Sequence, residues 1–219
     1  MDNLKTLLTS TTEFQKVVQT HVNFLVPAQG ARYLVAHQAA ALSLEHANGA
    51  RVLIDYGLLP TAFALMRPQF ECLLRGVWLL HVASENWVAK LSAPLTVESA
   101  KQANEGPMLA EMFKQLDSDI AAPQALVAQL KQYRDATWKV MNSYAHGGLH
   151  PLSRTLTGYP VELVYDIVRN SNAIVALAAQ LISILSGDPK NMEPVRKFHV
   201  DFAGQRHRAA VGMAFPPTA

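Results

Sequence analysis

The chain has 219 residues, of which half are hydrophobic and only 16% are charged. This is enough apolar material for the core of one domain and excludes a disordered chain. The formal net charge of +2 is too small to require or to exclude nucleic acid as a partner.

The single cysteine, Cys72, cannot form an intramolecular disulfide, so we expect a reducing, cytoplasmic location. The N-terminus lacks a basic region followed by an apolar run, so we expect no signal peptide. We predict one all-α domain over residues 1–219, with its core at about residues 11–186 and a tail at 187–219.

Apolar residues recur at helical spacing along nearly the whole chain, and no strand pattern persists. The first amphipathic helix is expected to start at residues 10–12, whose hydroxyls can cap it, and to close at Pro27. A second helix covers about residues 31–56, and Gly49 is a candidate bend within it.

The stretch 58–83 is apolar on nearly all sides, which is typical of a helix at the centre of a bundle. Pro68 lies inside it, frees the carbonyl of Ala64 and predicts a kink. Three charges in the stretch argue against a membrane span. We therefore predict a buried helix of a soluble bundle with no membrane partner.

Residues 85–123 are less regular. A helix start capped by Thr96 and a short helix over 107–116 are expected here, as a lid or as a cover for one end of the bundle. A long helix then runs over about residues 123–145.

Paired glycines at 147 and 148 stop that long helix, and Pro151 is expected to prevent a restart nearby. The last predicted helix covers 160–186, and the remaining tail is expected to fray. The whole pattern favours an all-α bundle of about six to eight helices.

Arg67, Glu71 and Arg75 lie four residues apart, so a helix places them in one stripe. Glu71 lies between the two arginines and can pair with either. Such a stripe can be an ion-pair ladder that fixes helix packing, or it can line a binding site. In a binding site, an arginine can hold a phosphate through two parallel hydrogen bonds.

Lys139, Asn142 and His146 form a second polar face before the glycines, flanked by Ser143 and Tyr144. If this helix packs beside the central one, the two polar faces meet. A histidine such as His146 is a residue type suited to general acid–base catalysis, and it can also cap the helix C-terminus. Lys139 can equally be a solvated lysine.

His146 and His150 suggest a metal pair by spacing alone. The glycines end the helix between the two histidines, and no carboxylate lies nearby in sequence. We therefore predict neither a metal site nor a cofactor. Cys72 is not expected to be a nucleophile, because an apolar position raises the pKa of a thiol and hides the sulfur.

The segments RPQFECLLRGVWLL (67–80) and NSYAHGG (142–148) resemble the HEPN superfamily, and most closely an uncharacterised bacterial branch of it. The resemblance covers about residues 44–151. It implies a helical bundle, often a homodimer, that cleaves RNA without metal, and a toxin or phage-defence role with a partner protein from the same operon. The family motif joins an arginine, a polar residue and a histidine. His146 matches the histidine, and Lys139 is the nearest cation at the spacing of the arginine.

The leading hypothesis is thus a HEPN-like protein that binds RNA or a nucleotide. Its expected catalytic residues are His146, Arg67 and Glu71. Its expected ligand-binding residues are Arg75, Lys139, Asn142 and Tyr144. Two alternatives stay open: a non-catalytic helical interaction module or scaffold whose polar ladder is structural, and a small-molecule enzyme built on a bundle.

Overall fold

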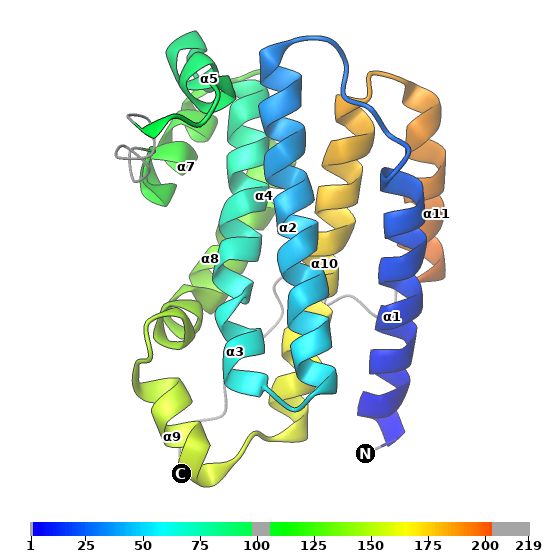
Figure 1. Ribbon diagram of the computed structural model, residues 1–219, viewed down its shortest axis with the longest axis vertical. Coiled ribbons are helices and arrows are strands. Elements are labelled where there is room, and N and C mark those ends of the chain that lie inside the picture. Colours follow the sequence, from blue (N-terminus) through cyan, green and yellow to red (C-terminus); the bar gives the residue numbers. More distant parts are fainter. Residues whose placement is uncertain (1, 98–105, 203–219) are drawn as a thin grey trace.

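The computed structural model describes residues 2–97 and 106–202, and every regular element in these ranges is a helix (Figure 1). This confirms the all-α class. In chain order the elements are α1 (Asp2–Val22), α2 (Ala31–Asp55), α3 (Leu59–Ala64), α4 (Met66–His81), α5 (Glu85–Ser92), α7 (Leu109–Ser118), α8 (Gln124–Ala145), α9 (Leu149–Thr157), α10 (Val161–Leu185), the 3-10 helix η1 (Pro189–Asn191) and α11 (Met192–Asp201).

The bounds of α2, α8 and α10 agree with the predicted ranges to within one residue at each end. Glycines with positive φ follow each of them, at Gly57, Gly147 and Gly187. A positive φ is sterically unfavourable for residues with a Cβ atom, so helices that end in this conformation usually have glycine there. The glycines therefore allowed these helix ends to be predicted from the sequence. Gly49 does not interrupt α2, which continues through it.

The predicted start of α1 is wrong, because this helix begins at Asp2. The hydroxyls of Ser10 and Thr12 donate to the carbonyls of Thr6 and Leu8, one turn earlier. Their side chains are therefore satisfied within the helix and cap nothing.

The predicted kink before Pro68 is a full break. α3 ends at Ala64, Leu65 forms a turn, and Pro68 lies in the first turn of α4. A missing N–H costs little in a first turn, whereas in one continuous helix the proline ring would clash with the carbonyl of Ala64.

The short helices α5 and α9 were not predicted. Ser84 caps α5, because its hydroxyl accepts a hydrogen bond from the Trp87 N–H. α9 starts directly after the paired glycines, so the expectation that Pro151 would prevent a restart is wrong: the proline lies in the first turn of α9. The helix start expected at Thr96 would extend into 98–105, outside the described residues.

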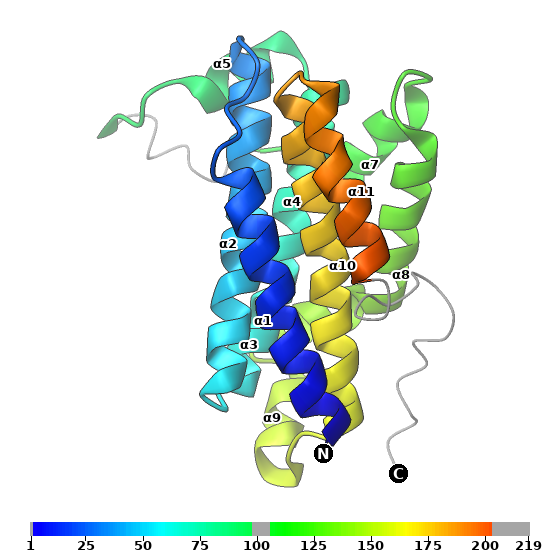
Figure 2. The same ribbon diagram turned by 90° about the vertical axis from the view of Figure 1, so that its right-hand side faces the viewer.

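The chain does not simply fray after residue 186. η1 and α11 follow α10, and α11 packs against α10 and α1 (Figure 2). Val195 and Phe198 of α11 are buried, and the Phe202 ring lies 5.2 Å from that of Phe14. The core therefore extends past its predicted limit, while residues 203–219 lie outside the described part.

The core is centred on α4, which packs against α2, α7, α8 and α10. Phe70, Val77 and Trp78 on this helix are fully buried. α2 approaches α4 closely at Gly76, where a Cβ atom would lie 3.2 Å from the backbone oxygen of Ala36. The glycine therefore permits this helix contact.

In the described residues, α10 is the one helix long and apolar enough to span a membrane, with 72% of its apolar stretch buried inside the bundle. Length and composition alone do not separate a membrane span from a core helix. α10 here packs against α1, α2, α4 and α11.

Candidate functional site

The candidate site lies where α4 packs against α8. The two helices are held together by apolar and aromatic contacts, and the rings of Phe70 and Tyr133 stack with their centroids 5.1 Å apart. The residues nearer the solvent on the same side of α4 are Arg67 and Glu71. The sequence prediction that the two polar faces come together therefore holds for part of each face.

Arg67 is the centre of the cluster. Its Nε donates to Glu71 Oε1 at 2.8 Å, and its Nη1 lies 2.5 Å from Nε2 of His146. Its Cζ lies 5.0 Å from the centroid of the Trp138 ring. Guanidinium nitrogens only donate, so Nε2 of His146 accepts and carries no proton in this arrangement. One arginine thus joins a carboxylate, an imidazole and an indole.

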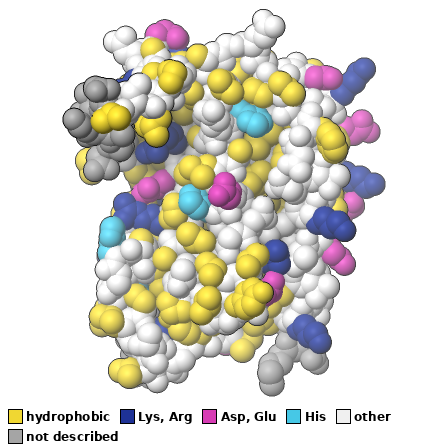
Figure 3. Space-filling model, viewed as in Figure 1, with side chains coloured by type: hydrophobic (Ala, Val, Ile, Leu, Met, Phe, Trp, Pro, Cys, Tyr) yellow, Lys and Arg dark blue, Asp and Glu magenta, His cyan; other side chains and the backbone are white. Residues whose placement is uncertain are grey.

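The cluster is open to water. The side chains of Arg67 and Glu71 are 25% and 28% exposed, and His146 is exposed. Figure 3 shows basic, acidic and histidine side chains together at the left edge of the molecule, beside a hollow in its outline. A ligand in solution can therefore reach the site without any rearrangement of the core.

The position of His146 follows from the end of α8. It is the C-cap residue, and its backbone N–H donates to the carbonyl of Asn142 at 3.1 Å. Gly147 then turns the chain away with φ of +64°. The expected capping position and the contact with Arg67 therefore occur together in the same residue.

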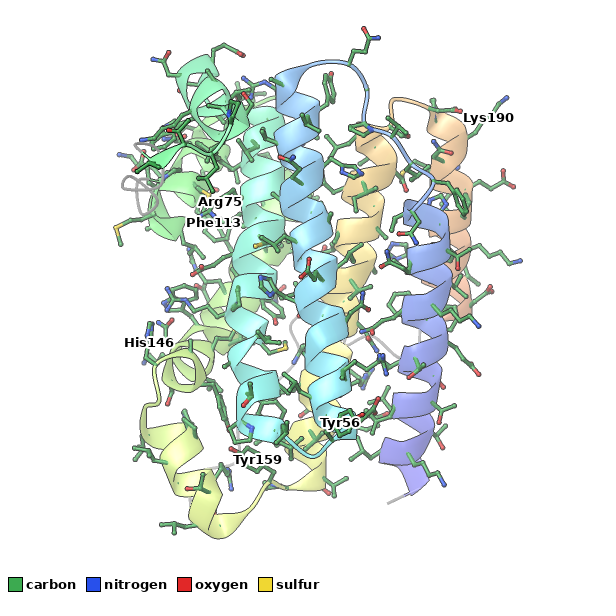
Figure 4. All side chains as sticks on the ribbon, viewed as in Figure 1. Tyr56, Arg75, Phe113, His146, Tyr159 and Lys190 are labelled. Carbon is green, nitrogen blue, oxygen red and sulfur yellow. The ribbon has the colours of Figure 1, made fainter. Side chains whose placement is uncertain are left out.

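Arg75 lies two turns beyond Arg67 on α4, on the side toward Phe113 of α7, whereas His146 lies lower on the molecule at the end of α8 (Figure 4). A Cβ atom on Gly106 would lie 3.9 Å from an Nη atom of Arg75. Among the described residues, Glu71 forms its ion pair with Arg67 and not with Arg75. Arg75 therefore stands apart from the contacts of the cluster.

Cys72 is buried on α4, beside this stripe. Burial raises the pKa of its thiol; Arg75 opposes this shift, and Glu71 adds to it. A thiol of this kind stays protonated near neutrality, which makes it a poor nucleophile.

Two other expected ligand-binding residues do not contact Arg67. Lys139 is exposed. Asn142 is half-buried, and its Oδ1 atom is buried without a hydrogen-bond partner among the described residues. Their predicted role in ligand binding stays a prediction.

Tyr144 points away from the cluster and into an aromatic group. Its ring meets Phe63 edge-on at 5.2 Å and stacks on His150 at 6.2 Å. Burial raises the pKa of its phenol far above the ordinary value, and the neighbouring Tyr159 adds to this shift. In this position Tyr144 packs the end of the bundle.

Trp138 is not among the site residues that the sequence predicted. Its position could have been predicted, because Trp138, Asn142 and His146 are spaced four residues apart and so lie on one face of the helix. The indole supplies the surface against which Arg67 stacks, an interaction that arginine favours.

His146 contacts Arg67, whereas the ring of His150 stacks on Tyr144. The backbone N–H of His150 also donates to the Ser143 hydroxyl at 3.0 Å, which holds the turn between α8 and α9. Across residues 2–97 and 106–202, no group of three or more His, Cys, Asp or Glu side chains is placed to hold a metal ion.

One protein-family model matches residues 40–208, and it is described as a family of unknown function (DUF6988). The matched region includes all four residues of the cluster and most of the bundle. No curated protein and no solved structure matches the chain.

Proposed function

We propose that this chain, which belongs to the DUF6988 family of unknown function, is a HEPN-like protein that binds RNA or a nucleotide at the Arg67 cluster. The supporting observation is the arrangement around the guanidinium. Glu71, His146 and Trp138 hold Arg67 in one orientation, while the side chain stays one-quarter exposed.

A phosphate group suits the remaining donors of Arg67. The contacts with Glu71 and His146 use Nε and part of Nη1, which leaves N–H groups on Nη1 and Nη2 for a ligand. Fixing the guanidinium in advance lowers the entropic cost of binding. Trp138 is partly exposed beside it and is of the type on which a base can stack.

We further propose that the protein is a metal-independent ribonuclease with His146 as its general base. Nε2 of His146 is free of a proton, as a base requires, but its lone pair faces Arg67. A phosphate that takes over Nη1 would release this lone pair for a ribose 2′-hydroxyl. Arg67 would then stabilise the charge that develops on the phosphate, and Glu71 would keep Arg67 oriented.

The wider proposal includes a cytoplasmic location, which follows from the single cysteine, and three parts that follow from the resemblance alone. The protein is a homodimer. It acts in a toxin–antitoxin or phage-defence system. A partner protein from the same operon regulates it.

Incubation with RNA in the presence of EDTA tests the activity. We expect the unaltered protein to cleave a single-stranded RNA, and His146→Ala to leave it intact. Lys16→Ala is the matched control, because it removes an exposed cation from α1, far along the chain from the cluster. If the unaltered protein and His146→Ala give the same blank result, the ribonuclease proposal is wrong.

Binding without cleavage needs a separate measurement. A fluorescently labelled RNA should bind the unaltered protein and the Lys16→Ala variant alike, and Arg67→Ala should weaken this binding. The dependence of log K on log salt should also become shallower in Arg67→Ala, by about one unit for one lost phosphate contact. If the salt dependence of Arg67→Ala equals that of the unaltered protein, Arg67 does not contact a phosphate of the RNA.

The alternative function is a non-catalytic interaction module with a structural polar ladder. One observation favours it: Arg67 joins α4 to α8 across 79 positions of the chain, as a tie between helices would. In that case His146→Ala would leave RNA unaffected and would lower the free energy of unfolding instead. Measuring cleavage and unfolding on the same variant separates the two functions.

A further inference from the structure

A second concave region lies on another part of the molecule, between α1 and α2. α1 packs mainly on α10 and α11, while α2 packs mainly on α4 and α10. The two helices therefore stand side by side over α10 (Figure 1). Between them lies a groove of about 430 Å³.

The groove has an apolar floor and a polar rim. Val22, Leu44 and Ile182 are buried at its base. The rim carries the side-chain amides of Gln19, Asn23 and Asn48, together with His37 and Glu45.

Glu45 is the one formally charged side chain among the residues that line the groove, and no lysine or arginine lines it. Glu45 is exposed, and no hydrogen bond or ion pair joins it to another residue of the described ranges. Its neighbour along the chain is His46; burial lowers the pKa of that imidazole, and the charge of Glu45 opposes this shift. The groove therefore has a negative charge that is not neutralised within it.

The other polar side chains of the groove are neutral. Burial lowers the pKa of His37, and a hydrogen bond from its ring to the Leu25 carbonyl opposes this shift. Nε2 of His37 is buried and has no hydrogen-bond partner among the described residues. Asn48 donates to Oε1 of Gln19 at 3.4 Å, so one amide from α1 and one from α2 meet at the end of the groove.

We propose that this groove binds a small ligand that joins a protonated amine to an aliphatic body, with the amine on Glu45 and the body over Val22, Leu44 and Ile182. The volume lies in the range of small-molecule sites, and an apolar floor with few polar groups is their usual composition. The negative charge selects against phosphates and carboxylates.

This site is chemically opposite to the Arg67 cluster. The cluster offers an arginine to an anion, and the groove offers a carboxylate to a cation. The proposal for the groove does not depend on the proposed RNA binding, and the failure of either one leaves the other standing.

Hexylammonium is a suitable probe, with hexan-1-ol and hexanoate as matched compounds of the same chain length. Titration of the full-length protein, followed by amide NMR shifts, should give saturable changes at Ala41, Leu44 and Glu45 with hexylammonium. Hexan-1-ol should bind about threefold more weakly, because it lacks the charge that pairs with the exposed carboxylate. Hexanoate should not bind there.

Glu45→Gln keeps the shape of the rim and removes the charge, so it should reduce the affinity for hexylammonium about threefold, as for an exposed ion pair, and leave that for hexan-1-ol unchanged. Glu193→Gln, on the exposed side of α11, is the control and should change neither. Equal affinities for the three probes, no saturable shifts at the groove, or undiminished binding by Glu45→Gln would each overturn the proposal. Because Glu45 is exposed, the variant is expected to fold.

Discussion

Two polar groups on α4, only two residues apart, have opposite surroundings. Gln69 is 1% exposed; its Nε2 donates to the Ser171 carbonyl, and its Oε1 accepts from the Ser171 hydroxyl. Its own carbonyl accepts from Ser43 of α2. Arg67 faces the other side, one-quarter exposed, with donors left over.

The comparison separates a structural group from a candidate functional one. Every polar atom of the Gln69 side chain is bonded within the bundle, so this network specifies how α2, α4 and α10 pack and offers nothing to a ligand. The Arg67 cluster is oriented by its neighbours yet keeps free N–H groups. Exposure and remaining donors, rather than residue type, distinguish the two.

Gln69→Leu should cause the largest loss of stability, because it removes the structural member of this pair. The change removes both side-chain hydrogen bonds and leaves the Ser171 hydroxyl buried without its acceptor. We expect the free energy of unfolding to fall by about 2–3 kcal/mol, measured by urea denaturation. A loss below about 0.5 kcal/mol would show that the network contributes little.

Gly76→Ala tests the close packing of α2 on α4. The new methyl group would lie 2.9 Å from Leu181 Cδ2 and 3.2 Å from the Ala36 backbone oxygen, and the backbone cannot easily yield. We expect a loss of about 1–3 kcal/mol in the free energy of unfolding.

Gly49→Ala is the matched control for that change. Its methyl group would lie 3.4 Å from a flexible Leu65 side chain, inside a continuous helix. We expect it to be neutral or to stabilise the protein by up to about 1 kcal/mol. Equal losses in both variants would show that a general helix effect, and not the contact with α2, is measured.

Lowering the pH should reduce the free energy of unfolding, because several histidines are shielded from water in the folded protein. Burial lowers the pKa of His37, so the unfolded chain takes up a proton at the ordinary value of 6.5 and the folded chain only at lower pH. Stability is therefore full above about pH 6.5 and falls as the pH drops through the lower folded value. His21, His46 and His81 are shifted in the same direction, also chiefly by burial.

His37→Gln should remove one part of this decline. Urea denaturation at about pH 7.5 and about pH 5.5 should show a smaller loss of unfolding free energy in the variant than in the unaltered protein. An equal loss in both proteins would mean that His37 does not contribute.

Only a small loss of stability is expected for Arg67→Ala. A pair that is one-quarter exposed is screened by water, so we expect a loss below about 1 kcal/mol and a similarly small coupling to His146→Ala in a double-mutant cycle. A loss of about 3 kcal/mol would instead identify the cluster as a structural tie between α4 and α8.

The parts of the fold that the sequence predicted are those with strong local signals. Positive-φ glycines mark the ends of α2, α8 and α10, and Pro68 marks the break before α4. α9 and α11 were missed for a physical reason. Each is nine or ten residues long and carries a proline in its first turn, so it depends on tertiary contacts more than on its own sequence.

The candidate site was partly visible as well. Four-residue spacing placed Arg67 beside Glu71, and the helix end before the glycines placed His146 within reach. The sequence could not tell that Glu71 pairs with Arg67 and not with Arg75, or that Tyr144 turns into the aromatic group. Both depend on how α8 lies against α3 and α4.

By itself, therefore, the sequence determined the helical class, the ends of the long helices and the stripes on which charged residues lie, because these follow from backbone conformation and from spacing along one helix. Only the tertiary structure decided which stripes meet. It set Arg67 against His146 and Trp138, closed Gln69 inside the bundle and left a groove between α1 and α2. Such contacts depend on side-chain packing between distant segments, which no local pattern encodes.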